Sequence, residues 1–474
     1  MVAMFGTFHR LLLANVTFHG IATVAMWAIR NFERSARATP TKEDVIALIN
    51  NVNNVEYPGK ADELADIRMM LLRLWHLQFP YQEEVGHLLP RYLILFLETH
   101  PADPVIDIDQ EFSKIMGLSV KEFMTLGLAA YARGLNYDRL ERSYLHSAGQ
   151  RLFNPPLPAD KVEIFIGHMA SEFREFKRLC IEEEKSSPNA GPYVFNPLWV
   201  KPIVILPDGA LVMPVPRLLI HRITKGLYYD LLEAYREPAG NQFAVWFGHA
   251  FEEYAGIVLK ASLGEDKVFG EPLYGRVERA GPDWVVVDGE HCLALECRSS
   301  RLKKSAKTGG DYEEVLTLIR RAIIETAAKL PQKIKDLRDG ATGVNTSGVT
   351  TYLPAIVTAE PWYPEPQTLA MVREHLMEMG LQDFRFELMS VGDLERLAAW
   401  IENGGSLSIL QEKLADRNAQ DITLGSYLNE RAPDLRVPQV PNRLLMGKMD
   451  SYFNQLVTEM KRATPRDKAM DFGA

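Results

Sequence analysis

The chain has 474 residues and a formal net charge of −9, with a sequence pI of about 5.8. Such an acidic chain is not expected to bind nucleic acid over its whole surface, although a local basic cleft remains compatible with the charge. Its 47% apolar content can fill a large core divided among two or more domains. Its three cysteines, which include no C-x-x-C pair, favour a reducing cytoplasm over a disulfide framework or a structural zinc site.

Residues 11–29 are the first candidate helix of a helical N-terminal domain that we place at residues 1–150. These nineteen residues contain no Asp, Glu, Lys or Arg, which is long enough to test as a membrane span. Asn15, His19 and Thr23 recur every four residues, however, and form one polar stripe along the helix. The stripe favours a helix that packs within a water-soluble protein, so we expect no membrane partner.

Further helices are predicted from capping signals and apolar periodicity. Thr41 precedes acidic residues typical of a first helical turn. Ser119-Val120-Lys121-Glu122 is an S-x-x-E capping pattern that begins a predicted helix over 118–133. Residues 151–240 form a predicted mixed connector region with a hairpin around Pro207-Asp208-Gly209. The other helices predicted up to this point cover residues 61–78, 160–184 and 218–235.

The segment from 241 to 390 predicts a compact α/β (α+β) core. Its expected elements are a helix over 241–262, a strand over 268–274, two strands on either side of Asp288-Gly289, a helix over 311–337 and a strand over 349–358. Pro331 is expected to kink or split the long helix. The order αβββαβ predicts a sheet between helices. An edge strand over 384–388 follows, and residues 391–474 predict a helical C-terminal region with helices over 390–402, 407–414 and 443–462.

The hairpin carries the most informative residues, Asp283 and, after twelve further residues, Glu296. If Asp288 and Gly289 form the turn, Asp283 lies diagonally to Glu296 on the same face of the sheet. If the turn is one residue later, the two carboxylates lie directly opposite each other. A three-residue loop would instead place them on opposite faces. Paired carboxylates are the oxygen ligands that Mg²⁺ prefers, and the carbonyl of Cys297 can add another oxygen.

Residues from about 241 to 360 resemble a PD-(D/E)XK nuclease domain, which has the restriction-endonuclease-like fold. Pro282-Asp283 matches the PD pair, and Glu296-Cys297-Arg298 matches (D/E)XK except at its last position. Gly248-x-x-Phe251-Glu252 resembles the motif of the first helix. The resemblance implies Mg²⁺ (or Mn²⁺) held by Asp283 and Glu296, with Glu252 as a third carboxylate. It also implies that Gln332, on the helix after the hairpin, contacts the substrate or orients water.

Arg298 stands where this family normally has Lys. An arginine can bridge phosphate oxygens with two parallel hydrogen bonds, but it does not deprotonate. The resemblance leaves room for a relocated lysine, with Lys303 and Lys304 as candidates. The segment 298–307 contains five cations and no acid, so Arg301, Lys303, Lys304 and Lys307 are predicted to bind phosphates, the alternative being a solvated basic loop.

The resemblance implies a Mg²⁺-dependent nuclease that acts on nucleic acid, with DNA as the expected substrate. By analogy with prokaryotic members of the fold, it would serve restriction or antiphage defence. The alternative is a catalytically degenerate module that binds nucleic acid or a partner protein, because any role that needs a neutral amine is closed to Arg298. A third hypothesis is a helical scaffold in which the nuclease-like core is only structural. The helical flanks are candidate surfaces for a homodimer or for partner proteins.

Overall fold

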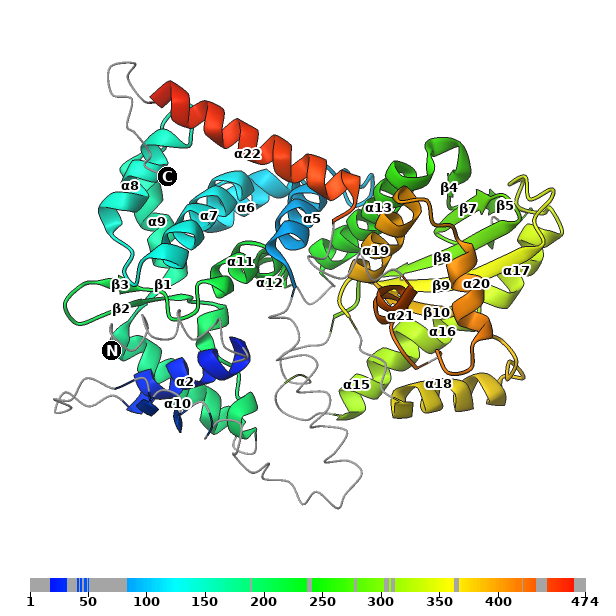
Figure 1. Ribbon diagram of the computed structural model, residues 1–474, viewed down its shortest axis with the longest axis horizontal. Helices are drawn as coiled ribbons and strands as arrows, with labels where there is room; N and C mark the ends of the chain where they lie inside the picture. The colour runs from blue at the N-terminus through cyan, green and yellow to red at the C-terminus, as the bar shows by residue number, and fades with distance from the viewer. Residues whose placement is uncertain are drawn as a thin grey trace.

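The protein is a mixed α/β molecule in which helices predominate (Figure 1). The computed structural model describes residues 18–31, 83–187, 190–236, 241–276, 279–301, 312–361, 366–419, 421–431 and 441–463, together with Lys307 and a few residues between 41 and 50. In Figure 1, helices of the N-terminal half lie on one side, and the larger sheet with its covering helices lies on the other. The C-terminal helix α22 extends from the second part across the first.

The N-terminal region is helical, as the periodicity predicts. Its helices are α2 (Phe18–Asn31), α5 (Val85–Leu97), α6 (Ile108–Met116), α7 (Val120–Asn136), α8 (Arg142–Arg151) and α9 (Ala159–Met169). The predicted capping box is confirmed at α7, where Ser119 accepts from the N–H of Glu122 and the Glu122 side chain accepts from the N–H of Ser119. The helix predicted over 61–78 lies outside the described residues. Among the described residues, no helix is both long and apolar enough to cross a membrane.

The predicted helix over 160–184 is wrong in its middle. A short strand, β1 (Ala170–Glu172), separates α9 from α10 (Phe173–Ser186) because it pairs in parallel with β2 (Ile203–Ile205), a partner that local periodicity does not reveal. β2 pairs with β3 (Leu211–Val212) in the predicted hairpin. The remaining elements of this region are η3 (Gly191–Tyr193), η4 (Pro197–Trp199), α11 (Arg217–Ile223) and α12 (Lys225–Ala234).

A five-stranded sheet in the order β10-β9-β8-β7-β4 organises the region after residue 241. β4, β7 and β8 are antiparallel neighbours, whereas β8, β9 and β10 run parallel. The elements that lead to β9 are α13 (Gln242–Leu263), η5 (Glu265–Lys267), β4 (Val268–Gly270), β5 (Leu273–Tyr274), β6 (Arg279–Ala280), β7 (Trp284–Asp288), β8 (His291–Arg298), α15 (Tyr312–Ile319), η6 (Arg320–Ile324), α16 (Glu325–Ala327), α17 (Leu330–Arg338) and β9 (Thr351–Thr358).

Two predicted elements of this region are divided in the structure. The strand expected over 268–274 is split into β4 and β5, and Pro272, which cannot donate to a strand ladder, lies between them. The long helix is split before Pro331, as expected, and it also contains the π-helical segment η6. After β9 come α18 (Pro366–Glu378), β10 (Glu387–Ser390), α19 (Val391–Glu402), α20 (Ser408–Ala415), α21 (Leu424–Arg431) and α22 (Arg443–Ala463). Of these, α18 and α21 were not predicted.

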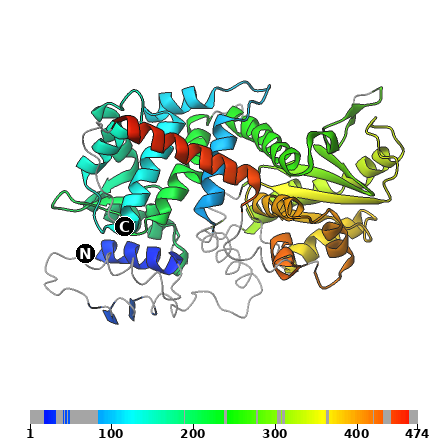
Figure 2. The same cartoon turned by 45° about the horizontal axis from the view of Figure 1, so that its top comes forward.

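Helices cover both faces of the large sheet (Figure 2). Leu293 and Leu295 of β8 belong to the same buried cluster as α13 and α19. Ala294 belongs to a separate cluster with α15 to α18 on the opposite face. Because strand side chains alternate, Glu296 and Arg298 lie on the face of Ala294, toward the helices α15 to α17. This alternation decides which helix can contribute side chains to the candidate site.

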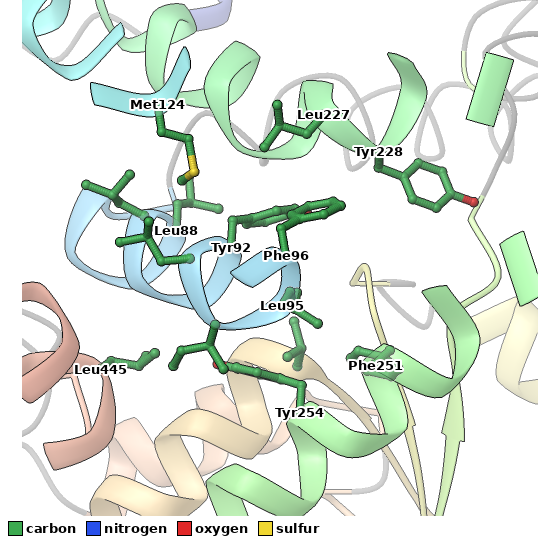
Figure 3. Close-up of a cluster of buried hydrophobic side chains, with 14 of the residues drawn as sticks. Leu88, Tyr92, Leu95, Phe96, Met124, Leu227, Tyr228, Phe251, Tyr254 and Leu445 are labelled. Atoms are coloured by element: carbon green, nitrogen blue, oxygen red, sulfur yellow. The ribbon is translucent and has the colours of Figure 1, made fainter. Parts of the chain in front are cut away.

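Helix α5 lies at the centre of the largest buried cluster (Figure 3). Tyr92 and Phe96 of α5 lie between Tyr228 of α12 on one side and Tyr254 of α13 on the other, with Leu445 of α22 nearby. The cluster therefore contains residues from the N-terminal, central and C-terminal regions of the chain. The large sheet is packed against the helical region and does not stand apart from it.

A buried carboxylate also joins these regions. Glu395 of α19 is 0% exposed and accepts hydrogen bonds from Arg91 Nε at 2.6 Å, Arg91 Nη2 at 2.7 Å and Tyr254 Oη at 2.6 Å. Burial acts to raise the pKa of Glu395, but the Arg91 guanidinium outweighs it and lowers that pKa to about 2. The pair is therefore ionised and holds α5, α13 and α19 together.

Candidate functional site

The β7–β8 hairpin places the two predicted acids opposite each other. Asp288 pairs with His291, so Gly289 and Glu290 form the turn, and Gly289 has a φ of 60° that suits glycine. Extending this register by one pair beyond Trp284 and Leu295 places Asp283 directly across from Glu296. Of the predicted arrangements, the structure has the one with the turn one residue later.

Both carboxylates are largely removed from water. The side chains of Asp283 and Glu296 are 13% and 2% exposed. Burial raises the pKa of Glu296, and the nearby charge of Asp283 raises it further. Burial also raises the pKa of Asp283, although the Cys297 N–H, which donates to Asp283 Oδ2 at 2.6 Å, opposes the rise. Two acids this close remain ionised only if cations compensate them.

Arg298 supplies the first compensating charge. Its Nη2 donates to Glu296 Oε2 at 2.9 Å, and its Nη1 lies 3.5 Å from Asp283 Oδ2. The guanidinium is fixed further by Nη1, which donates to the Cys297 carbonyl at 2.6 Å, and by Nε, which donates to Thr326 Oγ1 at 2.8 Å. Arg298, the last residue of β8, therefore lies close to both carboxylates.

Lys333 supplies the second charge, and the sequence analysis missed it. This residue of α17 places Nζ 2.5 Å from Glu296 Oε1, with its side chain 16% exposed. Lys333 is thus a lysine at the site that comes from a helix and not from the motif position. Lys303 and Lys304, the predicted candidates, lie outside the described residues. The available signal was its place beside the apolar stripe of the helix, next to Leu330 and Ile334.

Glu252 of α13 approaches the pair from the other side. Trp284 of β7 packs against Gly256, where an added Cβ would lie 2.0 Å from Trp284 Cζ2, and Trp284 Nε1 donates to the Glu252 carbonyl oxygen at 2.8 Å. Burial, and then the charge of Asp283, raise the pKa of Glu252 to about 7. The structure therefore brings Glu252 into the electrostatic neighbourhood of the two acids, and its role as a third carboxylate ligand remains a prediction.

Gln332 hydrogen-bonds within its own helix, and its contact with substrate or water remains a prediction. Its Nε2 donates to Asp336 Oδ1 of the same helix at 2.9 Å. The neighbouring residue, Lys333, is the one that reaches Glu296. A shift of one residue along α17 changes the helix face by about 100°, so Gln332 and Lys333 point in different directions.

Arg301 and Lys307 are engaged inside the protein, which corrects the prediction that they form an exposed phosphate-binding loop. The Arg301 side chain is 3% exposed, and its Cζ lies 3.9 Å from the centroid of the Tyr228 ring. Lys307 Nζ lies 2.9 Å from Glu360 Oε2, and Arg301 Nη1 lies 3.6 Å from the other oxygen of this carboxylate. Both cations thus attach the segment after β8 to Glu360, and Arg301 also attaches it to α12.

The oxygens at this site suit a divalent cation in chemistry, but a guanidinium lies among them. Asp283, Glu296 and the Cys297 carbonyl offer the hard oxygen donors that Mg²⁺ prefers. Arg298 contacts all three groups. Within the part of the chain that the structure describes, no cluster of three or more His, Cys, Asp or Glu side chains has the arrangement of a metal site. The donor chemistry therefore suits Mg²⁺, whereas the arrangement of the described residues, with Arg298 among the donors, is not that of a metal site.

Comparison with known proteins finds no family model and no curated sequence that matches this chain. The function is therefore inferred from the site itself.

Proposed function

We propose that this protein is a Mg²⁺- or Mn²⁺-dependent nuclease that hydrolyses phosphodiester bonds of nucleic acid, with DNA as the expected substrate. The observation that carries the proposal is the meeting of Asp283, directly before β7, with Glu296 of β8 and Lys333 of α17. Two acids and a lysine at the end of a hairpin, followed by a helix and a parallel strand, are what a restriction-endonuclease-like core requires. The sheet order and the αβββαβ succession support that assignment.

Each residue has a role that its contacts support. Asp283 and Glu296 would hold the divalent cation, which supplies Lewis-acid activation and charge neutralisation when it is bound. Lys333 has three N–H donors, so it can hold Glu296 and still donate to a phosphate oxygen. Arg298 can pair with two phosphate oxygens at once if it leaves the carboxylates. Lys333 would thus provide the lysine ammonium group that the (D/E)XK motif normally has at its last position.

A second candidate is a nucleic-acid-binding or partner-binding module without catalysis. The observation that favours it is that Arg298 and Lys333 already compensate the charges of Asp283 and Glu296. Such a module would bind DNA independently of metal and would not cut it.

The two functions are separated by a cleavage assay with a matched control. Wild type, Asp283→Asn and Asp288→Asn are incubated with supercoiled plasmid, linear duplex and single strands in Mg²⁺, Mn²⁺ or EDTA. Asp288 is an acid on the same strand, where it pairs with Lys267 at the other end of the hairpin. We expect metal-dependent cleavage by wild type and Asp288→Asn, and its loss in Asp283→Asn. Cleavage that persists in Asp283→Asn, or a folded wild type that cuts nothing, would refute the nuclease.

A further inference from the structure

Arg298 occupies the space in which the divalent cation of the proposed function would bind. Its guanidinium contacts Glu296 at 2.9 Å, the Cys297 carbonyl at 2.6 Å and Thr326 at 2.8 Å, and it lies 3.5 Å from Asp283. Three of these four partners are the oxygen groups assigned to the metal. The fourth, Thr326, has no other role in the proposed chemistry.

Thr326 is placed at the site by an irregular helix. It is 3% exposed on α16, directly after the π-helical segment η6. A π-helical turn inserts one residue and so rotates everything after it by about 100° relative to an uninterrupted α-helix. The insertion therefore changes the face that Thr326 and Lys333 present, and both side chains meet the hairpin. Helical irregularities of this kind are frequent at functional sites.

The charge balance shows why Arg298 and a divalent cation compete. Asp283 and Glu296 are compensated by Arg298 and Lys333, so the charges of these four side chains sum to zero. Glu252 beside them adds at most one negative charge, because its pKa is about 7. A cation with two charges that entered without moving Arg298 would leave the same buried space with a net charge of about +2, which burial strongly disfavours. Displacement of the guanidinium lowers this excess to about +1 and frees the Glu296 and Cys297 oxygens.

We propose that Arg298 is an internal cation that fills the metal position at rest, and that Thr326 is the positioning residue that holds it there. Loading of the site then requires Arg298 to leave. A phosphate of the entering nucleic acid is a suitable new partner for its planar fork. Nucleic acid and divalent cation therefore bind cooperatively, because each favours the displaced arginine. This inference rests on the proposed function, since it concerns the same site.

The test measures Ca²⁺ binding by titration calorimetry on the full-length protein without nucleic acid, so that no turnover is involved. Thr326→Val removes one hydrogen bond to a charged group, and we expect it to tighten Ca²⁺ binding about tenfold, equivalent to about 1.4 kcal/mol. Arg298→Gln is expected to tighten binding at least as much. Thr326→Ser keeps the hydroxyl and should return the affinity to the wild-type value. Thr351→Val makes the same change at the far end of the sheet and should have no effect.

The outcomes distinguish this inference from the proposed function. If Asp283→Asn abolishes Ca²⁺ binding while Thr326→Val and Arg298→Gln bind as wild type does, the metal site stands and the role of Arg298 is refuted. If Ca²⁺ binding is absent from every folded variant, or is the same in Asp283→Asn as in wild type, the metal site fails and the inference fails with it. Thr326→Val and Arg298→Gln are separate proteins, so if one of them fails to fold, the other still tests the inference.

Discussion

Replacement of Glu395 by Gln is expected to destabilise the whole protein, because it leaves the Arg91 guanidinium buried without its main partner. Arg91 is 4% exposed and Glu395 is 0% exposed. The pKa of Glu395 is held at about 2, below its ordinary 4.5, although burial acts in the opposite direction. This difference corresponds to about 3 kcal/mol in favour of the ionised form, in agreement with the ~3–5 kcal/mol that breaking a buried pair typically costs.

The effect of Glu395→Gln should also depend on pH. The folded pKa of Glu395 is depressed, so the stabilisation is present above the unfolded pKa of about 4.5 and is lost as the pH falls through about 2. We therefore expect the wild-type advantage to be complete at pH 7 and to shrink over this acidic range. Arg91 stays charged over this range, so the free-energy cost of burying it without a carboxylate in Glu395→Gln does not change with pH.

Urea unfolding, followed by circular dichroism and by tryptophan fluorescence, measures this loss. Glu412→Gln removes an exposed carboxylate of α20 and is the matched control. If α5, α13 and α19 act as one unit through Glu395, both signals should shift together in Glu395→Gln. A variant within about 0.5 kcal/mol of wild type would refute the argument, since that is the ordinary range for surface substitutions.

Two further substitutions test the site and its support. Lys333→Ala should lower the rate of nucleic-acid cleavage by about 10²- to 10³-fold, as the loss of one preorganised donor typically does. Lys335→Ala, on the same helix, should cleave at the wild-type rate, and equal rates for the two variants would exclude Lys333 from the chemistry. Gly256→Ala should destabilise the protein by about 1–3 kcal/mol in thermal unfolding, because the new Cβ would lie 2.0 Å from the Trp284 ring. Gly248→Ala, whose new Cβ would lie 3.5 Å from its nearest neighbour, should be tolerated, and equal melting temperatures for the two variants would contradict this packing.

The hairpin and its acids could be predicted because local rules determine them. The β-branched run before Asp288-Gly289 specifies the strands, and strand alternation then places Asp283 and Glu296 on one face for either two-residue turn. The choice between the two turns could not be made locally, since it depends on pairing with β4 and β9 on either side. The predicted capping box of α7 is equally local and is confirmed, and α19 has one of the same kind that was not predicted.

Lys333 and the burial of Arg301 could not be predicted in the same way. Which residue of a long helix faces a site depends on its exact rotation, and the π-helical segment before Thr326 changes that rotation without a clear sequence signal. Arg301 follows Arg298 in a basic stretch that looks solvated, yet it stacks on Tyr228 from a helix more than seventy residues earlier in the chain. Such distant partners become visible only once the helical region is packed against the sheet.

The charges at the site also connect its stability with its affinity for metal. Without a divalent cation, Asp283 and Glu296 need Arg298 to offset their mutual repulsion, so Arg298→Gln should be less stable than wild type in EDTA. If Arg298 only supported the fold, the variant would lose stability and gain nothing. If Arg298 instead fills the place of the cation, the variant should lose stability in EDTA and regain it in Ca²⁺, because a ligand stabilises the folded state by an amount that grows with the logarithm of its affinity. Only a residue that competes with the metal predicts both changes together.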